Sequence, residues 1–488
     1  MSAYSAPTAS RAPRWGIQAS LIQPRQPAFW FFVAALAIGG YLFAQEQLAM
    51  SALEQAFALS WVLVLAYALP VAFVVYRIDL FEREPKLMLA GALIWGGVIA
   101  TSFAGYANGA WLSVLGKVAP DLAAPWGAAI VGPGVEETLK LMGVVTLYLI
   151  ASSEFDGVMD GFVYGALVGL GFTVVEDVSY FIGAAALAPG GVSGSGPVWD
   201  TFLIRVVGGG LYGHVLFTGL TGIGLAYLVT QRRTALSRRL LGFALCLAAG
   251  VAAHAVWNSP WMQTILATDG GQPSVLQWVA YGAVKGLPFL LLLGLLVVFA
   301  TRSEESNFRS IVSGEPDPAV ITEPEIVSLR SLLTRRSTRL AAGRAGGPAA
   351  GRLVGQLQAA QIEYAMIRSR VESLGDPALE VERQKIRSLR AELARLPVAG
   401  GVTRGVAPGG VTRGVAQGVA PAGWAPTHLA PAGGMVAWAA PDPAQLPVAT
   451  LPPWLELAVE ARSGAWAQVR AVNGWRGWVD GRLLVPRG

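Results

Sequence analysis

The sequence is poor in charge and in cysteine, and both shortages exclude classes of protein. Of its 488 residues, 53% are hydrophobic and only 14% are Asp, Glu, Lys or Arg. Soluble chains carry about 25% charged residues, so a fully soluble protein is excluded. The single cysteine, Cys246, excludes a disulfide scaffold, and we interpret it as a small buried hydrophobe. The net charge of +5 is small and dispersed, so we expect no nucleic-acid partner.

The shortage of charge is concentrated in the first 300 residues, which hold 29 of the 67 charged side chains. Because a helix crosses a bilayer with about 20 mostly apolar residues, this part of the chain predicts a bundle of transmembrane helices. We expect a break at Pro133 and Gly134 in the fourth span, since proline interrupts helical hydrogen bonding. The eight candidate spans are 28–45, 55–76, 87–110, 123–150, 157–186, 201–230, 239–259 and 275–300.

Basic residues gather on one side of these spans, and this asymmetry orients the bundle. Eight spans with both termini in the cytoplasm put every basic cluster on the cytoplasmic side and leave Lys117 in a loop on the other side. The sequence therefore predicts a multi-pass membrane protein with cytoplasmic N- and C-termini. The basic residues that decide the orientation are Arg11, Arg14, Arg25, Arg77, Arg83, Lys86, Arg232, Arg233, Arg238 and Arg239.

Several ionisable residues lie inside the predicted spans, where each is unfavourable unless it is paired or hydrated. The fourth span carries Glu136, Glu137 and Lys140. Glu136 and Lys140 are four residues apart on one helical face, which favours a structural ion pair. Because one such pair does not neutralise two acids, the second carboxylate favours a function.

Polar residues of later spans fall at a similar depth. Glu176 belongs to the fifth span, His214 to the sixth, and His254 with Asn258 one turn later to the seventh. At about 1.5 Å per residue, Glu136, Glu176 and the two histidines lie between mid-membrane and the extracytoplasmic face. We therefore expect these residues to line one hydrated cavity open to that side.

Two chemistries suit carboxylates and imidazoles in such a cavity. The residues could bind a metal such as zinc and leave one position open for water. Alternatively, a desolvated glutamate could act as the general base while histidines stabilise the oxyanion. Either chemistry would hydrolyse an amide bond inside the membrane. The spacing matches neither the paired histidines of soluble zinc-protease helices nor a Ser–His or Cys–His pair.

Short motifs follow one another within residues 65–260. They are Phe81-Glu82-Arg83-Glu84-Pro85, Glu136-Glu137-Thr138-Leu139-Lys140, Asp160-Gly161-Phe162-Val163-Tyr164-Gly165, Gly169-Leu170-Gly171-Phe172 before Glu176, His214 before Thr218-Gly219, and His254-x-x-x-Asn258. In this order they resemble the PrsW family of bacterial intramembrane proteases, which is part of the superfamily of CAAX-prenyl proteases. One departure is Asp177, because many relatives have Asn after the preceding glutamate.

The resemblance implies a catalytic site and an activity. The catalytic residues that it implies are Glu136, Glu137, His214 and His254, assisted by Glu176 and Asn258, with Lys140 in a structural ion pair. A metal, if one is used, would be zinc held by Glu137, His214 and His254. The best-understood activity of the family is cleavage of a membrane-anchored anti-sigma factor on the extracytoplasmic side of the bacterial plasma membrane. The expected partners are therefore a membrane-anchored regulatory protein and the lipid bilayer.

The remaining 188 residues predict elements outside the membrane. Residues 301–396 are charged and have a helical pattern, with breaks near 343–351 and 375–377. Residues 397–435 are rich in Gly, Ala, Val and Pro and contain GVTRGVA twice, so they predict a linker without a core of its own.

The final segment, residues 436–488, predicts strands. Residues 448–459, 465–472 and 475–484 have strand-like patterns, and Asn473-Gly474 is a turn signal between them. The runs GAWAQV and GWRGWV in this segment resemble a bacterial SH3-like barrel, which implies a peptide ligand on the cytoplasmic side.

The predicted fold is an all-α polytopic membrane bundle of about eight transmembrane helices in residues 28–300, after a cytoplasmic segment in 1–27. A helical and low-complexity linker region and a small all-β SH3-like barrel follow. The expected function is an intramembrane endopeptidase. One alternative is a transporter or channel that uses the same polar cavity, and another is a membrane scaffold that acts through its C-terminal module. Residues 1–300 lack the internal sequence repeat that many transporters show.

Overall fold

The computed structural model describes most of the chain. The described residues are 19–78, 81, 84–188, 195–208, 212–260, 274–371, 373–396, 425–431, 435–442, 449–451, 455–472 and 475–487. Outside them lie most of the predicted N-terminal segment, Glu82 and Arg83, most of the predicted linker, and the Asn473-Gly474 turn. The chain divides into two compact units, of which the first is Met1–Val320 with Ala359–Arg387 and the second is Ile321–Gln358 with Ser388–Gly488.

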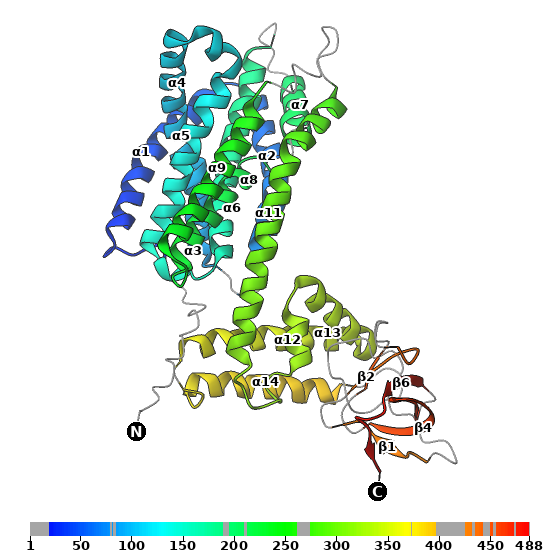
Figure 1. The fold of residues 1–488 in the computed structure, drawn as a ribbon. Coiled ribbons are helices and arrows are strands. Elements are labelled where there is room, and N and C mark those ends of the chain that lie inside the picture. Colours follow the sequence, from blue (N-terminus) through cyan, green and yellow to red (C-terminus); the bar gives the residue numbers. More distant parts are fainter. Residues whose placement is uncertain are drawn as a thin grey trace. The chain divides into compact units, whose positions relative to one another are not determined.

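Long helices form most of the first unit (Figure 1). Seven stretches of the described chain are long and apolar enough to cross a membrane, and each matches a predicted span. The remaining predicted span is α5, which has the length of a span but carries three charged residues at its middle. The elements are α1 (Pro27–Met50), α2 (Glu54–Ile78), α3 (Lys86–Ile94), η1 (Trp95–Ala100), α4 (Thr101–Val118), α5 (Pro120–Ile150), η2 (Ser152–Glu154), α6 (Val158–Ala186), α7 (Gly196–Phe202), η3 (Leu203–Gly208), α8 (Gly213–Thr230), α9 (Leu236–Asn258) and α11 (Val275–Val312).

The break expected at Pro133 and Gly134 is wrong, because α5 is one continuous helix that includes both Pro125 and Pro133. Proline removes one backbone hydrogen bond from a helix. Helices inside membranes tolerate this loss because neighbouring helices hold the segment in place. Pro133 is buried in the bundle, so packing accounts for the unbroken helix.

Helix α6 is buried along most of its length. A Cβ atom on Gly165 would lie 2.4 Å from the carbonyl oxygen of Thr218, and one on Gly169 would lie 2.1 Å from that of His214. Both distances are far below van der Waals contact, so these glycines allow α8 to approach α6 closely. The approach fixes the first turn of α8, which carries His214, against α6.

The last helix of the membrane bundle extends beyond the predicted span. Helix α11 has 38 residues and continues past residue 300, where the last predicted span ends. The predicted breaks are confirmed, because Gly346 and Gly347 have non-helical backbone angles and a new helix begins at Pro377. The helices are α12 (Glu323–Leu329), α13 (Leu332–Arg370) and α14 (Pro377–Arg395).

The C-terminal part of the second unit is an antiparallel sheet of five strands in the order β6-β5-β4-β1-β7, with β2 and β3 paired separately. The three strand-like segments are confirmed as β3 with β4, β5, and β6. Strand β1 precedes the expected start at residue 436 and pairs with β4 and β7. The sheet does not close in the described residues, so it is compatible with an open SH3-like fold. The strands are β1 (His428–Leu429), β2 (Met435–Ala437), β3 (Ala449–Leu451), β4 (Glu456–Ser463), β5 (Trp466–Ala471), β6 (Arg476–Asp480) and β7 (Val485–Pro486).

Candidate active site

The six residues expected to be catalytic or assisting come from four helices that meet inside the bundle. Five of the six join one hydrogen-bonded cluster through Lys140, and the sixth lines the cavity beside it. The residues are Glu136 and Glu137 on α5, Glu176 on α6, His214 on α8, and His254 and Asn258 on α9. The structure thus brings together residues that lie up to 122 positions apart in the sequence.

Lys140 connects the cluster. Its ammonium nitrogen lies 2.8 Å from Oε1 of Glu137, 3.3 Å from Oε2 of Glu136 and 2.7 Å from Nδ1 of His214. The same nitrogen lies 3.9 Å from the centre of the Phe172 ring, which is a cation–π contact. Because Lys140 is completely buried, the ammonium depends on these contacts for its stability. The expected pair with Glu136 is present, and Glu137 is even closer.

The contacts of His214 determine which of its nitrogens carries the proton. An ammonium has no acceptor, so Lys140 donates to Nδ1 and this nitrogen is unprotonated. The proton is then on Nε2, which donates to Oε2 of Glu176 at 3.1 Å. Both ring nitrogens of His214 therefore have partners in this arrangement.

His254 has a different environment. Its Nδ1 lies 3.0 Å from Oε1 of Glu137, to which it donates, and its Nε2 lies 3.7 Å from Oε2 of Glu136. The ring stacks on Phe217 at 4.8 Å with an angle of 13° between the planes. The edge of the imidazole that bears Nε2 therefore lies close to a carboxylate, and a water molecule beside the two atoms could bind both groups.

The two glutamates of α5 have different roles in this network. Both oxygens of Glu137 accept hydrogen bonds, Oε1 from Lys140 and His254 and Oε2 from the hydroxyl of Thr218 at 3.0 Å. Oε1 of Glu136 accepts from Nδ2 of Asn108 at 3.0 Å, and Oε2 accepts from Lys140 at 3.3 Å. The same Oε2 lies 3.7 Å from Nε2 of His254, so Glu136 faces the nitrogen that Glu137 does not contact.

A second ion-pair network holds Glu176. Arg205 on η3 donates to Oε2 of Glu176 at 2.8 Å and to Oδ1 of Asp177 at 2.7 Å. The hydroxyl of Tyr67 donates to the other oxygen of Asp177, and the guanidinium lies over the Tyr180 ring. Asp177, the residue that departs from the family pattern, is therefore paired with a cation in this chain.

Sequence reasoning missed Arg205, Asn108 and the contact of Thr218 with Glu137. An arginine inside a predicted span is itself a signal, because ionisable groups in spans are unfavourable without a partner. Nothing in the sequence pattern distinguishes Asn108 from other polar residues near a span, since its contact with Glu136 depends on how α4 packs against α5.

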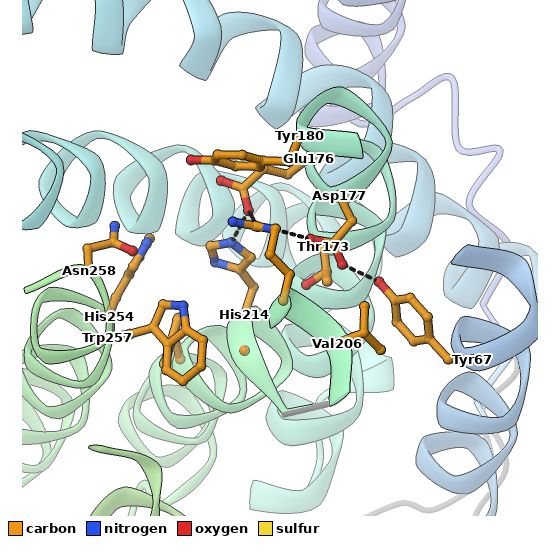
Figure 2. A pocket seen from close by; sticks show the side chains of 13 residues that line it. Tyr67, Thr173, Glu176, Asp177, Tyr180, Val206, His214, His254, Trp257 and Asn258 are labelled. Carbon is orange, nitrogen blue, oxygen red and sulfur yellow. Dashed lines mark hydrogen bonds and ion pairs between the residues drawn. The ribbon is translucent and has the colours of Figure 1, made fainter. Parts of the chain in front are cut away.

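A small cavity adjoins the two histidines, and we call it the histidine cavity (Figure 2). Its volume is about 50 Å³, which is space for a few water molecules, since one water needs about 10–15 Å³. Asn258 lines it and donates to the backbone oxygen of Ala128 at 3.2 Å. The lining residues are Tyr67, Thr173, Glu176, Asp177, Tyr180, Arg205, Val206, Gly213, His214, Phe217, His254, Trp257 and Asn258.

One group of side chains could hold a metal ion. Glu136, His214 and His254 each offer a ligand atom, and these atoms lie within 4.8 Å of one another. One carboxylate and two imidazoles form a donor set that zinc uses in catalytic sites. This group differs in one residue from the expected set, since it has Glu136 in place of Glu137. The residues therefore fit a metal ion after small movements of the side chains. The ion would bind Nε2 of His214, or it would bind Nδ1 in place of the ammonium of Lys140.

Comparison with known proteins gives one match. Residues 84–287 match the family model described as PrsW family intramembrane metalloprotease. No curated protein and no solved structure matches the chain. The matched segment contains all six expected catalytic and assisting residues, as well as Lys140 and Arg205. Residues 84–287 of this multi-pass membrane protein are therefore similar to the PrsW family of intramembrane metalloproteases.

Proposed function

We propose that this chain hydrolyses a peptide bond in or near the membrane span of a membrane-anchored regulatory protein, similar to an anti-sigma factor. The observation that carries this proposal is the gap of 3.7 Å between Oε2 of Glu136 and Nε2 of His254, beside the histidine cavity. A water molecule beside these two atoms could donate one hydrogen bond to each group. Both groups are already oriented by other contacts, which is a requirement for efficient proton transfer.

The pair of Glu137 and His254 supports proton transfer from that water. Glu137 accepts from Nδ1 of the imidazole, so it fixes the tautomer in which Nε2 can take a proton. The buried carboxylate also stabilises the imidazolium that results, as the carboxylate does in a catalytic triad. We assign His254 as the acceptor of the proton and Glu136 as the residue that positions the water.

The rest of the reaction follows from this assignment. The oxygen of the water attacks the carbonyl carbon, and the negative charge develops on the carbonyl oxygen. Asn258, one turn after His254, has a second N–H that could donate to this oxygen. When the C–N bond breaks, the imidazolium returns its proton to the amine nitrogen, so atoms and charges balance.

A metal is compatible with the same residues. Glu136, His214 and His254 would hold it, and when bound it would supply Lewis acidity toward the water and the scissile carbonyl. Glu137 would keep its orienting hydrogen bond to His254, as carboxylates do behind metal-bound histidines. Glu176 would play the same part for His214, because it already accepts from Nε2.

The test compares new N-termini in membranes from cells that produce the wild-type chain, Glu136→Gln or His254→Ala. We expect termini inside or next to membrane spans with the wild type, and a loss of about 100-fold or more with either variant. Glu54→Gln and His428→Ala change the same residue types outside the site and should leave cleavage unchanged. Equal cleavage by all five proteins would contradict the proposal.

We also infer that both termini are cytoplasmic and that the site opens to the other side. The support is the placement of basic residues in the loops, which is the strongest sequence determinant of orientation. Reporter fusions after residue 260 and at residue 488 test this. A fusion at 488 that is active only outside the cytoplasm would reverse the orientation.

A further inference from the structure

A groove larger than the histidine cavity lies between α4 and α5, and we call it the α4–α5 groove. Its volume is about 640 Å³, whereas the histidine cavity has about 50 Å³. Pockets that bind organic ligands or peptide side chains have volumes of about 300–1,000 Å³. The lining residues are Phe103, Ala107, Trp111, Ile130, Val131, Gly134, Val135, Thr138 and Leu139. The histidine cavity can admit water but is too small for a polypeptide, so the substrate needs another entrance.

One hydrogen bond joins α4 and α5 at residues that follow lining residues of the groove. Asn108 follows the lining residue Ala107 on α4, and its Nδ2 donates to Oε1 of Glu136, the residue after Val135 on α5. The other amide atom, Oδ1 of Asn108, is buried and has no hydrogen-bond partner among the described residues. Because a buried acceptor without a donor is unfavourable, a peptide N–H that reached this oxygen would form a favourable hydrogen bond.

The helix that forms one wall of the groove is exposed along most of its length. Only Ser102 and Ala104 are buried among the 18 residues of α4, and both lie in its first turn. Figure 1 shows α4 beside α5 at the edge of the bundle. The α3–η1–α4 stretch is apolar enough to cross a membrane, so the groove faces hydrocarbon and its occupant must be apolar.

We propose that the α4–α5 groove receives the transmembrane helix of the substrate and presents its backbone to Glu136 across Asn108. Water then reaches the same carboxylate from the histidine cavity, so the two reactants enter by separate routes. The proposal rests on the proposed protease function for its biological meaning, but binding in the groove can be measured without cleavage.

The first experiment uses a substitution that fills the groove with a side chain. A Cβ atom on Gly134, which lines it, meets no atom within 4 Å, so Gly134→Leu adds a side chain without a clash in the bundle. Gly109 on α4 is equally open but does not line the groove, so Gly109→Leu is the matched control. Both substitutions replace glycine by a better helix former, so they affect helix stability alike.

The second experiment detects binding directly in the inactive His254→Ala background. A photoreactive residue replaces Ala107 in the groove or Leu245, which is exposed on α9. The probe is a synthetic biotinylated peptide with about 20 leucine and alanine residues between lysines, in dioleoylphosphatidylcholine vesicles with the full chain. We expect about tenfold more peptide adduct from position 107 than from 245, and Gly134→Leu but not Gly109→Leu should remove the excess.

Three outcomes would overturn the groove as the docking site. These are equal adduct yields at positions 107 and 245, lipid adducts alone at position 107, and an excess that Gly109→Leu removes and Gly134→Leu does not. A different result is expected if the groove binds the peptide but the chain is not a protease. In that case the excess of peptide adduct at position 107 persists and depends on Gly134, while the wild-type chain produces no new N-termini in membranes.

Discussion

The ammonium of Lys140 lies 2.7 Å from Nδ1 of His214 and also contacts both glutamates of α5. A lysine side chain therefore occupies the point at which two carboxylates and an imidazole converge. A divalent cation that used Glu136 and Nδ1 of His214 would compete with this ammonium for the same lone pairs. This competition can be measured as a change in the zinc affinity of the site when the lysine is replaced.

Replacing the lysine should increase the affinity of the site for zinc. In Lys140→Gln the two glutamates lose their buried counter-charge, and a divalent ion can supply it. We expect zinc to bind about tenfold more tightly than in the wild type, measured by competition with a chromophoric chelator in detergent. Lys285→Gln is the control, because Lys285 is also buried but donates to the backbone oxygens of Trp257 and Ser259. Unchanged or weaker zinc binding by Lys140→Gln would show that the ammonium and the metal do not compete.

The planar guanidinium of Arg205 should affect the cleavage rate more than the charge of Asp177 does. Arg205→Lys keeps a positive charge, but an ammonium does not reproduce the planar geometry that binds Glu176 and Asp177 together. We expect a loss of about tenfold in the initial rate of substrate cleavage. Asp177→Asn still offers an oxygen to the arginine, so its loss should stay below about threefold. The opposite order of the two effects would contradict this account of the ion-pair network.

Close packing of α6 against α8 should control the position of His214. A methyl group at Gly169 would lie 2.1 Å from the backbone oxygen of His214, so Gly169→Ala must push the first turn of α8 away. A shift of about 1 Å in a catalytic group can lower the rate about 100-fold. Gly183→Ala, on the same helix, meets no atom within 4 Å and serves as the control. Cleavage rates and melting temperatures of both variants distinguish a local shift, which lowers the rate alone, from general unfolding.

Glu154 should make the stability of the protein depend on pH. Burial raises the pKa of its carboxyl from 4.5 to about 7, although the N–H of Ala19 and the charge of Arg370 oppose the rise. A carboxyl with a raised folded-state pKa binds its proton more tightly in the folded protein. Its contribution to stability is therefore greatest below pH 4.5 and is lost as the pH rises to about 7.

Glu154→Gln tests this directly, because the amide oxygen can still accept from Ala19 but cannot ionise. Between pH 5 and 8 the wild type should lose about 2 kcal/mol more unfolding free energy than the variant, after allowance for screening. Thermal unfolding in detergent at several pH values gives the comparison. Parallel curves for the two proteins would assign the pH dependence to other groups.

The sequence by itself determined the membrane bundle and predicted most residues of the candidate site. Apolar runs of about 20 residues mark helices that cross a bilayer, because hydrocarbon leaves the backbone no other way to satisfy its hydrogen bonds. Ionisable residues inside such runs are rare enough to mark Glu136, Glu137, His214 and His254 as candidates, and the motif resemblance then grouped them. Helix periodicity also predicted the contact between Glu136 and Lys140, since both lie on one helix.

Only the tertiary structure shows which residues of different helices contact one another in the candidate site. The group that could hold a metal contains Glu136 with the two histidines rather than the expected Glu137. The roles of Arg205 and Asn108 and the α4–α5 groove likewise depend on the distances between helices. The spacing of residues along the chain determines which of them share a face of one helix. How closely two helices approach depends on side chains from both, as at the contact of Gly169 with α8.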